Sequence, residues 1–167
     1  MKKRLTIIQM DVHVNDVEYN YNRVQELLVQ SLSESPDIIV LPETWNTGFY
    51  PSKELFNIAD RNGERTKSLL STFAKEHNVN IVGGSVAVAK NDVVFNTSYA
   101  YNREGKLVGE YLKMHGFSPA KEDQYFAGGT NTTHFELDGI PCSTVICYDI
   151  RFPELVRMAA LPNTELL

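Results

Sequence analysis

Three ionisable residues follow apolar segments at widely separated points of the chain. Glu43 comes after "IIVLP", Lys113 ends "LVGEYLK", and Cys147 ends "STVIC". A thiol attacks a carbonyl carbon only as its thiolate, and an unperturbed thiol has a pKa of roughly 8.5. A nearby ammonium lowers that pKa and stabilises an oxyanion, while a carboxylate moves protons. Brought into one pocket, these three side chains would suit amide hydrolysis through a covalent thioester.

Each of the three residues also has an ordinary structural explanation. Chains commonly return to polar residues where a strand ends, and cysteine is often buried as a small apolar side chain. Glu43 has a further argument in its favour, because open α/β sheets place ligand-binding groups just beyond the carboxyl ends of buried strands. The elements that carry the three residues therefore decide between a structural and a catalytic role.

The hydrophobic pattern predicts strands over residues 4–11, 36–43 and 79–89. It predicts amphipathic helices over residues 15–35, capped by Asn15, and 65–78. Two hairpins follow over residues 92–115 and 133–147, turning at "NREG" and at Asp138-Gly139, and Pro153 opens a last helix. Strands with helices packed outside them indicate an α/β layered protein, which we expect to form a single domain over residues 1–167.

The composition is that of an ordinary globular protein, with 43% hydrophobic and 22% charged residues. A net charge of −5 argues against nucleic acid as a partner. The apolar runs are too short to cross a bilayer, and the first residues carry no signal-peptide cleavage pattern, so we expect a cytoplasmic protein without membrane partners. Cys142 and Cys147 fall on opposite faces of one predicted strand, and metal-ligand spacing is lacking, so we expect neither a disulfide nor a zinc site.

Three blocks of the sequence resemble the nitrilase superfamily of carbon–nitrogen hydrolases. They are "LPETWNTGF" around Glu43, "GEYLKMH" around Lys113 and "VICYDIRFPEL" around Cys147, in the family's order, with "IVGGS" and "YFAGG" as secondary matches. The resemblance implies an α-β-β-α sandwich that usually dimerises, a Glu-Lys-Cys triad, and no metal or organic cofactor. It also implies that Glu122 helps to position the substrate and that the amide of Tyr148 joins Lys113 as an oxyanion donor.

Within that family, the blocks look most like the ω-amidase branch. Its members hydrolyse the terminal amide of short dicarboxylic monoamides such as 2-oxoglutaramate, releasing a carboxylate and ammonia. N-carbamoyl compounds and simple aliphatic amides are the alternative substrates. The small-molecule amide is thus the expected partner, together with a second copy of the chain.

Several other residues have an expected place. Trp45 and Phe49 lie beside Glu43 and are pocket candidates, as are His115 and Tyr125, although a loop histidine or aromatic residue can equally serve local packing. We expect close strand packing, and no phosphate binding, at Gly83 and Gly84. We further expect Cys142 in the core and an ion pair between Asp149 and Arg151.

The resemblance implies that relatives continue beyond the helix after the cysteine, whereas this sequence ends at Leu167, inside the next expected strand. We therefore expect the sandwich to be incomplete at its C-terminus, which leaves an inactive scaffold or dimerisation module as an alternative to an enzyme. A thiol redox protein would need a Cys-x-x-Cys pair, and a glutamine amidotransferase would need a histidine after Cys147. The sequence contains neither feature.

Overall fold

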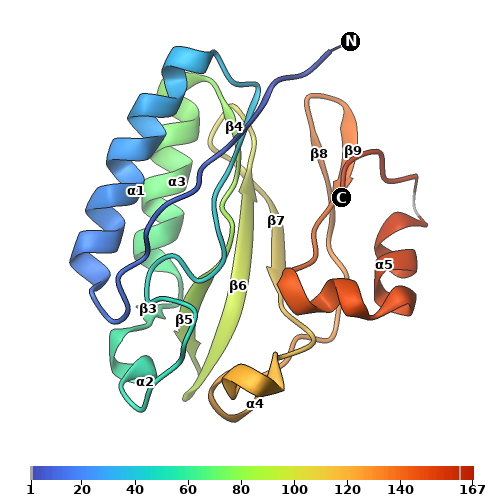
Figure 1. The fold of residues 1–167 in the computed structure, drawn as a ribbon. Coiled ribbons are helices and arrows are strands. Elements are labelled where there is room, and N and C mark those ends of the chain that lie inside the picture. Colours follow the sequence, from blue (N-terminus) through green and yellow to red (C-terminus); the bar gives the residue numbers. More distant parts are fainter. Residues whose placement is uncertain (1, 162) are drawn as a thin grey trace.

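The structure, a computed structural model, describes residues 2–161 and 163–167. Helices and strands are arranged in four layers (Figure 1). In chain order the elements are β1 (Leu5–Ile7), α1 (Val17–Ser31), η1 (Leu32–Glu34), β2 (Ile38–Val40), α2 (Leu55–Ile58), β3 (Asp60–Arg61), α3 (Glu64–His77), β4 (Asn80–Val82), β5 (Val86–Lys90), β6 (Val93–Tyr101), β7 (Leu107–Leu112), η2 (Ser118–Ala120), α4 (Glu122–Tyr125), β8 (His134–Leu137), β9 (Ile140–Ser143), η3 (Cys147–Arg151) and α5 (Pro153–Ala160), where η marks a 3-10 helix.

The larger sheet determines which chain ends come together. Within the described residues its strand order is β1-β2-β4-β6-β5-β3, and β7 pairs with β6. Strands β1, β2 and β4 are parallel to one another, and β6 runs antiparallel to both β4 and β7. The carboxyl ends of β2 and β7 therefore point the same way, towards the end of the sheet at which β6 starts, the lower end in Figure 1.

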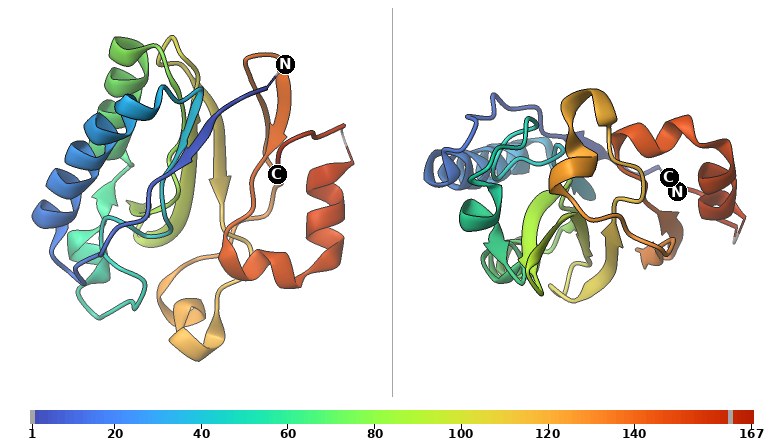
Figure 2. Two further views of the ribbon diagram at one scale, coloured as in Figure 1. Left: turned by 45° about the horizontal axis from the view of Figure 1, so that its top comes forward. Right: turned by 90° about the horizontal axis from the view of Figure 1, so that it is seen from below.

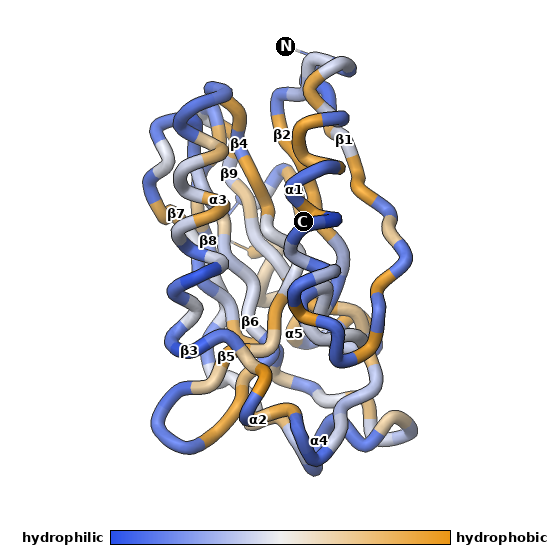
Figure 3. The backbone as a smooth tube through the Cα atoms, turned by 90° about the vertical axis from the view of Figure 1, so that its left-hand side faces the viewer, coloured by the Kyte–Doolittle hydropathy of each residue, from blue (hydrophilic) through white to orange (hydrophobic). Residues whose placement is uncertain are grey.

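The two faces of this sheet are covered differently. Ile39 of β2 packs with Val24 of α1 and Leu70 of α3, whereas its neighbour Ile38 packs with Leu137 of β8 on the opposite face. Successive side chains of a strand point to opposite faces, so a strand covered on both faces must be apolar throughout. Figure 3 shows the apolar residues of β2, beside helices in which apolar and polar residues alternate.

The predicted α-β-β-α sandwich is confirmed. Helices α1 and α3 cover one face of the larger sheet, the β8–β9 hairpin covers the other, and α5 lies outside the hairpin (Figures 1 and 2). Leu166 forms a parallel bridge with Cys142, at the place where the sequence predicts the start of another strand. Cys142 is buried in the core between the sheets, as expected. None of the helices within the described residues is long and apolar enough to cross a membrane.

Several boundaries differ from the prediction, and the first two strands are shorter than the predicted ranges. Helix α1 is capped by Asp16, whose carboxylate accepts a hydrogen bond from the Tyr19 amide, while Asn15 has a left-handed φ of 63°. The strand predicted over residues 79–89 is divided into β4 and β5 by Gly83 and Gly84. The strand predicted to reach Cys147 ends four residues earlier, at the end of β9.

Candidate active site

Glu43 lies on a loop that leaves β2 and is held against the β4–β5 connection. The Ser85 hydroxyl accepts a hydrogen bond from the Thr44 amide at 3.0 Å, and the Ser85 amide donates to the Pro42 carbonyl at 3.0 Å. Gly84 has a φ of +59°, and a Cβ atom there would lie 2.0 Å from the Pro42 oxygen. The close packing predicted at this glycine is therefore confirmed, and it brings the Glu43 loop onto the sheet.

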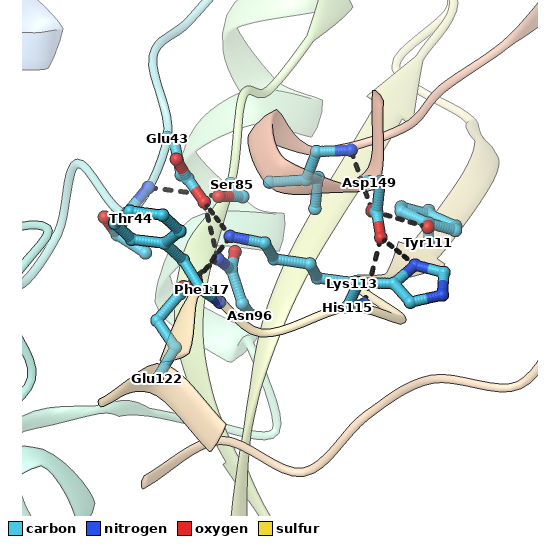
Figure 4. Close-up of polar contacts among 11 residues, drawn as sticks. Glu43, Thr44, Ser85, Asn96, Tyr111, Lys113, His115, Phe117, Glu122 and Asp149 are labelled. Atoms are coloured by element: carbon cyan, nitrogen blue, oxygen red, sulfur yellow. Dashed lines mark hydrogen bonds and ion pairs between the residues drawn. The ribbon is translucent and has the colours of Figure 1, made fainter. Parts of the chain in front are cut away.

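Lys113 follows β7 directly and is paired with β6 through its backbone. Its amide donates to the Asn96 carbonyl at 2.9 Å. Its ammonium donates to Glu43 Oε1 at 2.7 Å and to Glu122 Oε2 at 2.7 Å, and the lysine is only 4% exposed. Figure 4 shows the Glu43 and Glu122 carboxylates on either side of this ammonium. The structure thus joins three of the predicted site residues directly.

Asn96, on β6, is a fourth member of this cluster and was not predicted. Its side-chain amide donates to Glu43 Oε1 at 3.0 Å and lies 3.4 Å from Glu122 Oε1. Glu122 belongs to the short helix α4, is 1% exposed, and also accepts a hydrogen bond from the Phe117 amide at 2.7 Å. The contacts of Glu122 are therefore with Lys113 and its neighbours, so its carboxylate acts on the position of the lysine.

Cys147 is the first residue of η3 and has a left-handed φ of 45°. A non-glycine residue in that region costs of order 1–3 kcal/mol and persists only where the surroundings enforce it. Asp149 enforces it here, because Asp149 Oδ2 accepts a hydrogen bond from the Ile146 amide while the Asp149 amide donates to the Ile146 carbonyl. The nucleophile candidate therefore sits at a tight turn after the strand, with an exposed thiol.

The thiol lies within the electrostatic reach of the cluster. Partial burial of the sulfur, the charge of Glu43 and a hydrogen bond to Glu43 raise the pKa of Cys147, and the nearby Lys113 offsets this only in part. The sequence predicts that Lys113 lowers the pKa of Cys147, but in the structure the opposite effects of burial and Glu43 are larger. Burial lowers the pKa of Lys113, but hydrogen bonds to Glu122 and Glu43 and the charges of both carboxylates raise it by more.

Asp149 anchors a second polar network beside the nucleophile. It is fully buried, and besides the Ile146 amide it accepts hydrogen bonds from the Tyr111 hydroxyl at 2.7 Å and from the His115 amide at 2.9 Å. His115 Nδ1 lies 2.8 Å from the same carboxylate, and Figure 4 shows these contacts. The expected ion pair with Arg151 is wrong, because Asp149 points into the protein while Arg151 is exposed.

Aromatic rings extend from the Glu43 loop to α5. Phe49 lies 6.2 Å from Phe117, whose ring is 5.1 Å from that of Tyr148. Tyr148 meets Phe152 edge-on at 5.6 Å, and Phe152 stacks on His115 at 3.5 Å between ring centroids. Phe49 and Tyr148 thus belong to an aromatic wall beside the Glu43–Lys113–Glu122 cluster. His115 lies at the other end of this row of rings, where it contacts Asp149 of η3.

Two pocket candidates lie elsewhere. Trp45 is fully buried in the core under α1, where its indole N–H donates to the Gly83 carbonyl at 3.0 Å, so the prediction that it lines the pocket is wrong. Tyr125 ends α4 and packs near Leu55 and Phe56, in a separate groove of about 380 Å³. Both residues are close to site residues in sequence, but Trp45 belongs to the core and Tyr125 packs against a separate apolar cluster.

A cavity of about 180 Å³ lies against the cluster and is lined in part by Asn96, Lys113, Glu122 and Phe126. A larger groove of about 560 Å³ lies between α1 and α3, away from these residues. We place the candidate site at the Glu43–Lys113–Glu122 cluster beside the smaller cavity, because the two carboxylates and the ammonium meet there. Among the described residues, no group of three or more His, Cys, Asp or Glu side chains could hold a metal ion.

Comparison with known proteins gives consistent matches. The carbon–nitrogen hydrolase family model matches residues 4–167. A 2-oxoglutaramate amidase of Bacillus subtilis (strain 168) is 41% identical over 167 residues, which is all of this chain and 64% of that protein. An omega-amidase of Danio rerio is 30% identical over 178 residues, covering 99% of this chain and 62% of that protein. The chain therefore spans a little under two thirds of the length of these relatives.

Solved structures agree with these matches. An amidase from Nesterenkonia sp. superimposes with a TM-score of 0.86 at 20% identity, over 98% of this chain and 63% of that one, which supports the fold. A superfamily member from Xanthomonas campestris, with an arsenic adduct in its active site, gives a TM-score of 0.81 at 29% identity, over 91% of this chain and 56% of that one. Sequence match, fold and the cluster at the sheet's end agree, and the chain belongs to the carbon–nitrogen hydrolase family.

Proposed function

We propose that this chain carries the catalytic centre of an amidase that hydrolyses a small primary amide through a cysteine thioester. The observation that carries the proposal is the contact of one buried ammonium, Lys113, with the carboxylates of Glu43 and Glu122, beside the thiol of Cys147. A nucleophile, a proton carrier and a fixed positive charge are the parts that acyl transfer from an amide requires.

In the proposed reaction, the sulfur of Cys147 attacks the amide carbon while Glu43 takes the thiol proton. The oxygen of the tetrahedral intermediate is stabilised by the Lys113 ammonium and the backbone N–H of Tyr148. The C–N bond then breaks, and ammonia leaves with the proton that Glu43 returns. In the second half, Glu43 takes a proton from water, which attacks the thioester carbon, and the products are a carboxylate and the free thiol.

We further propose that the substrate is the ω-amide of a short dicarboxylic monoamide such as 2-oxoglutaramate. The proposal is supported by the name and the 41% identity of the Bacillus subtilis relative, and by the name of the Danio rerio relative. The aromatic wall that includes Phe49, Phe117 and Tyr148 would cover the carbon chain of a small amide.

The decisive experiment is ammonia release from 2-oxoglutaramate by the protein and by its Cys147→Ala variant. A matched control is Cys142→Ala, which removes the other thiol from the core between the two sheets. We expect release by the parent protein and by the control, loss of release in Cys147→Ala, and a mass increase on Cys147 when the reaction is quenched early. Release that persists in Cys147→Ala would refute the mechanism, and release only from an N-carbamoyl or simple aliphatic amide would refute the substrate.

We also propose that the enzyme works as a homodimer in the cytoplasm. Met158 on α5, Leu161 at its end and Ile150 before it are more than half exposed, which is the apolar surface expected of a subunit contact. A reducing compartment would keep the exposed Cys147 thiol free for catalysis. Sedimentation of the parent protein against a Met158→Asp variant tests the dimer, and a monomeric parent protein would contradict it.

A further inference from the structure

Asn96 is a buried polar residue in the middle of the long strand β6. It is 1% exposed, and asparagine is depleted in strands because it fits a pleated apolar surface poorly. Its side-chain oxygen is buried without a hydrogen-bond partner, and leaving such a group unpaired destabilises the fold. The burial of this polar side chain and its unpaired oxygen both disfavour the fold. The contacts of the Asn96 amide nitrogen indicate what compensates for them.

The orientation of the Asn96 amide follows from the charges around it. Its nitrogen faces Glu43 Oε1 at 3.0 Å and Glu122 Oε1 at 3.4 Å (Figure 4). Turning the amide over would bring its oxygen against two carboxylates, which also accept hydrogen bonds, so the pair would repel. The unpaired oxygen is thus the consequence of presenting both N–H groups to the two carboxylates.

The Asn96 amide donates a hydrogen bond to one of the two carboxylate oxygens of Glu43, Oε1. Oε1 accepts from the Lys113 ammonium at 2.7 Å and from the Asn96 amide, so two donors hold the same oxygen. Within the described residues, Oε2 receives no hydrogen bond from nitrogen donors, and Glu43 lies close enough to Cys147 for its charge to raise the pKa of the thiol. Two donors on one oxygen fix the rotation of the carboxylate and direct the other oxygen outward.

We propose that Asn96 is a positioning residue that, with Lys113, holds Glu43 Oε1, so that Oε2 is the oxygen that exchanges the proton with Cys147. The proposal rests on the proposed function, and it specifies which carboxylate oxygen does the work and what orients it. Because the amide nitrogen of Asn96 faces the two carboxylates, it acts through Glu43. The amide nitrogen of Asn96 also lies between the Glu43 and Glu122 carboxylates.

The test measures the titration of Glu43 and the pH dependence of turnover in Asn96→Ala and Asn96→Asp. Loss of a donor from a carboxylate raises its pKa, so we expect the Glu43 carboxyl signal in ¹³C NMR to titrate about one pH unit higher in Asn96→Ala. The signal is assigned by its absence in Glu43→Gln. Asn96→Asp keeps the side-chain volume and adds a like charge, so we expect at least as large a shift and no cavity.

For turnover, we expect the acid limb of kcat/KM to move upward with the Glu43 titration. We also expect kcat to fall by about 10- to 100-fold with KM changed by less than about threefold. Asn80 supplies a matched control, since it too is a buried asparagine on a strand of this sheet, with its amide bonded to Asp37 O and its oxygen unpaired. Asn80→Ala is expected to leave the Glu43 titration and the acid limb unchanged.

The outcomes separate the inference from the proposed function. An unchanged Glu43 titration in both Asn96 variants, or an equal change in Asn80→Ala, overturns the inference. A rise in KM with kcat unchanged would instead make Asn96 a substrate contact and would also overturn it. If no amide is turned over by any variant but Glu43 titrates as expected, the proposed function fails while the positioning role of Asn96 stands.

Discussion

Replacing Asp149 with asparagine tests whether this residue enforces the turn that presents the nucleophile. Each oxygen of the buried carboxylate accepts from one backbone N–H, Oδ1 from His115 and Oδ2 from Ile146. The Tyr111 hydroxyl and the His115 ring share the same two oxygens, and both can adapt by rotating a proton or changing tautomer. The backbone donors cannot adapt, so either orientation of an asparagine sets its NH₂ against one of them.

The size of the effect follows from this count of donors. An orphaned buried N–H costs about 1–3 kcal/mol, and hydrogen bonds to a charged acceptor, about 1.5–3 kcal/mol each, would become weaker neutral ones. We therefore expect Asp149→Asn to reduce the free energy of unfolding by about 3–5 kcal/mol, a large share of the 5–15 kcal/mol typical of a domain. At about 2–4 °C per kcal/mol, the Tm would fall by roughly 6–20 °C.

The assay is thermal and urea unfolding followed by circular dichroism, beside an Asp11→Asn control. The Asp11 side chain is 90% exposed and makes only a long contact with His13, so this control removes the same charge without a buried network. We expect the control to unfold within about 0.5 kcal/mol of the parent protein. A Tm for Asp149→Asn within about 2 °C of the control would refute the argument that this carboxylate holds the turn at Cys147.

Two further predictions concern the glycine beside the Glu43 loop and the ionic contacts at the opposite end of the sheet. Gly84→Ala should reduce kcat by more than about 100-fold and lower the Tm, because the new Cβ would lie 2.0 Å from the Pro42 carbonyl oxygen. The control is Gly139→Ala, whose Cβ would have nothing within 4 Å. It should lower the free energy of unfolding by only about 1 kcal/mol and leave kcat unchanged. A hydrogen bond from Arg103, aided by Lys3, holds the pKa of Asp138 well below its ordinary value. The resulting stability is present above the unfolded-state pKa of about 3.9 and is lost as pH falls towards the folded-state pKa. Urea titrations should therefore show Asp138→Asn to be about 1 kcal/mol less stable than the parent protein at pH 7. This difference in the free energy of unfolding should disappear below about pH 4.

Much of the fold was predictable, because strand and helix patterns are local properties of the sequence. The period of two in the hairpins and the period near four in α1 and α3 follow from which side chains each element buries. The end of β9 was not predictable in this way, since "STVIC" is apolar throughout and reads as a strand. The strand ends where its partner begins, because Ser143 pairs with His134, the first residue of β8, and no periodicity in the sequence reveals this limit.

The chemistry of the site was only partly predictable. Residue type and position after apolar segments picked out Glu43, Lys113 and Cys147, because ionisable groups there stand out against their neighbours. Asn96 does not ionise and lies within a strand, so its role emerges only when β6 is placed beside β7. The prediction for Trp45 was wrong for a different reason, since closeness to Glu43 in sequence does not show that the side chain two residues later points into the core.

The charges around Cys147 decide how the thiol is activated. Its pKa is raised by burial and by Glu43 more than Lys113 lowers it, so the resting thiol keeps its proton at neutral pH. Lys113 cannot accept that proton, because its two carboxylate partners raise its own pKa and hold it as an ammonium. The carboxylate whose charge acts on the thiol is Glu43, so in the proposed reaction the attack on the substrate is coupled to proton transfer to that carboxylate. In the proposed reaction this arrangement also gives the second carboxylate a purpose, because the contact with Glu122 would keep Lys113 charged and in place after Glu43 has taken the proton.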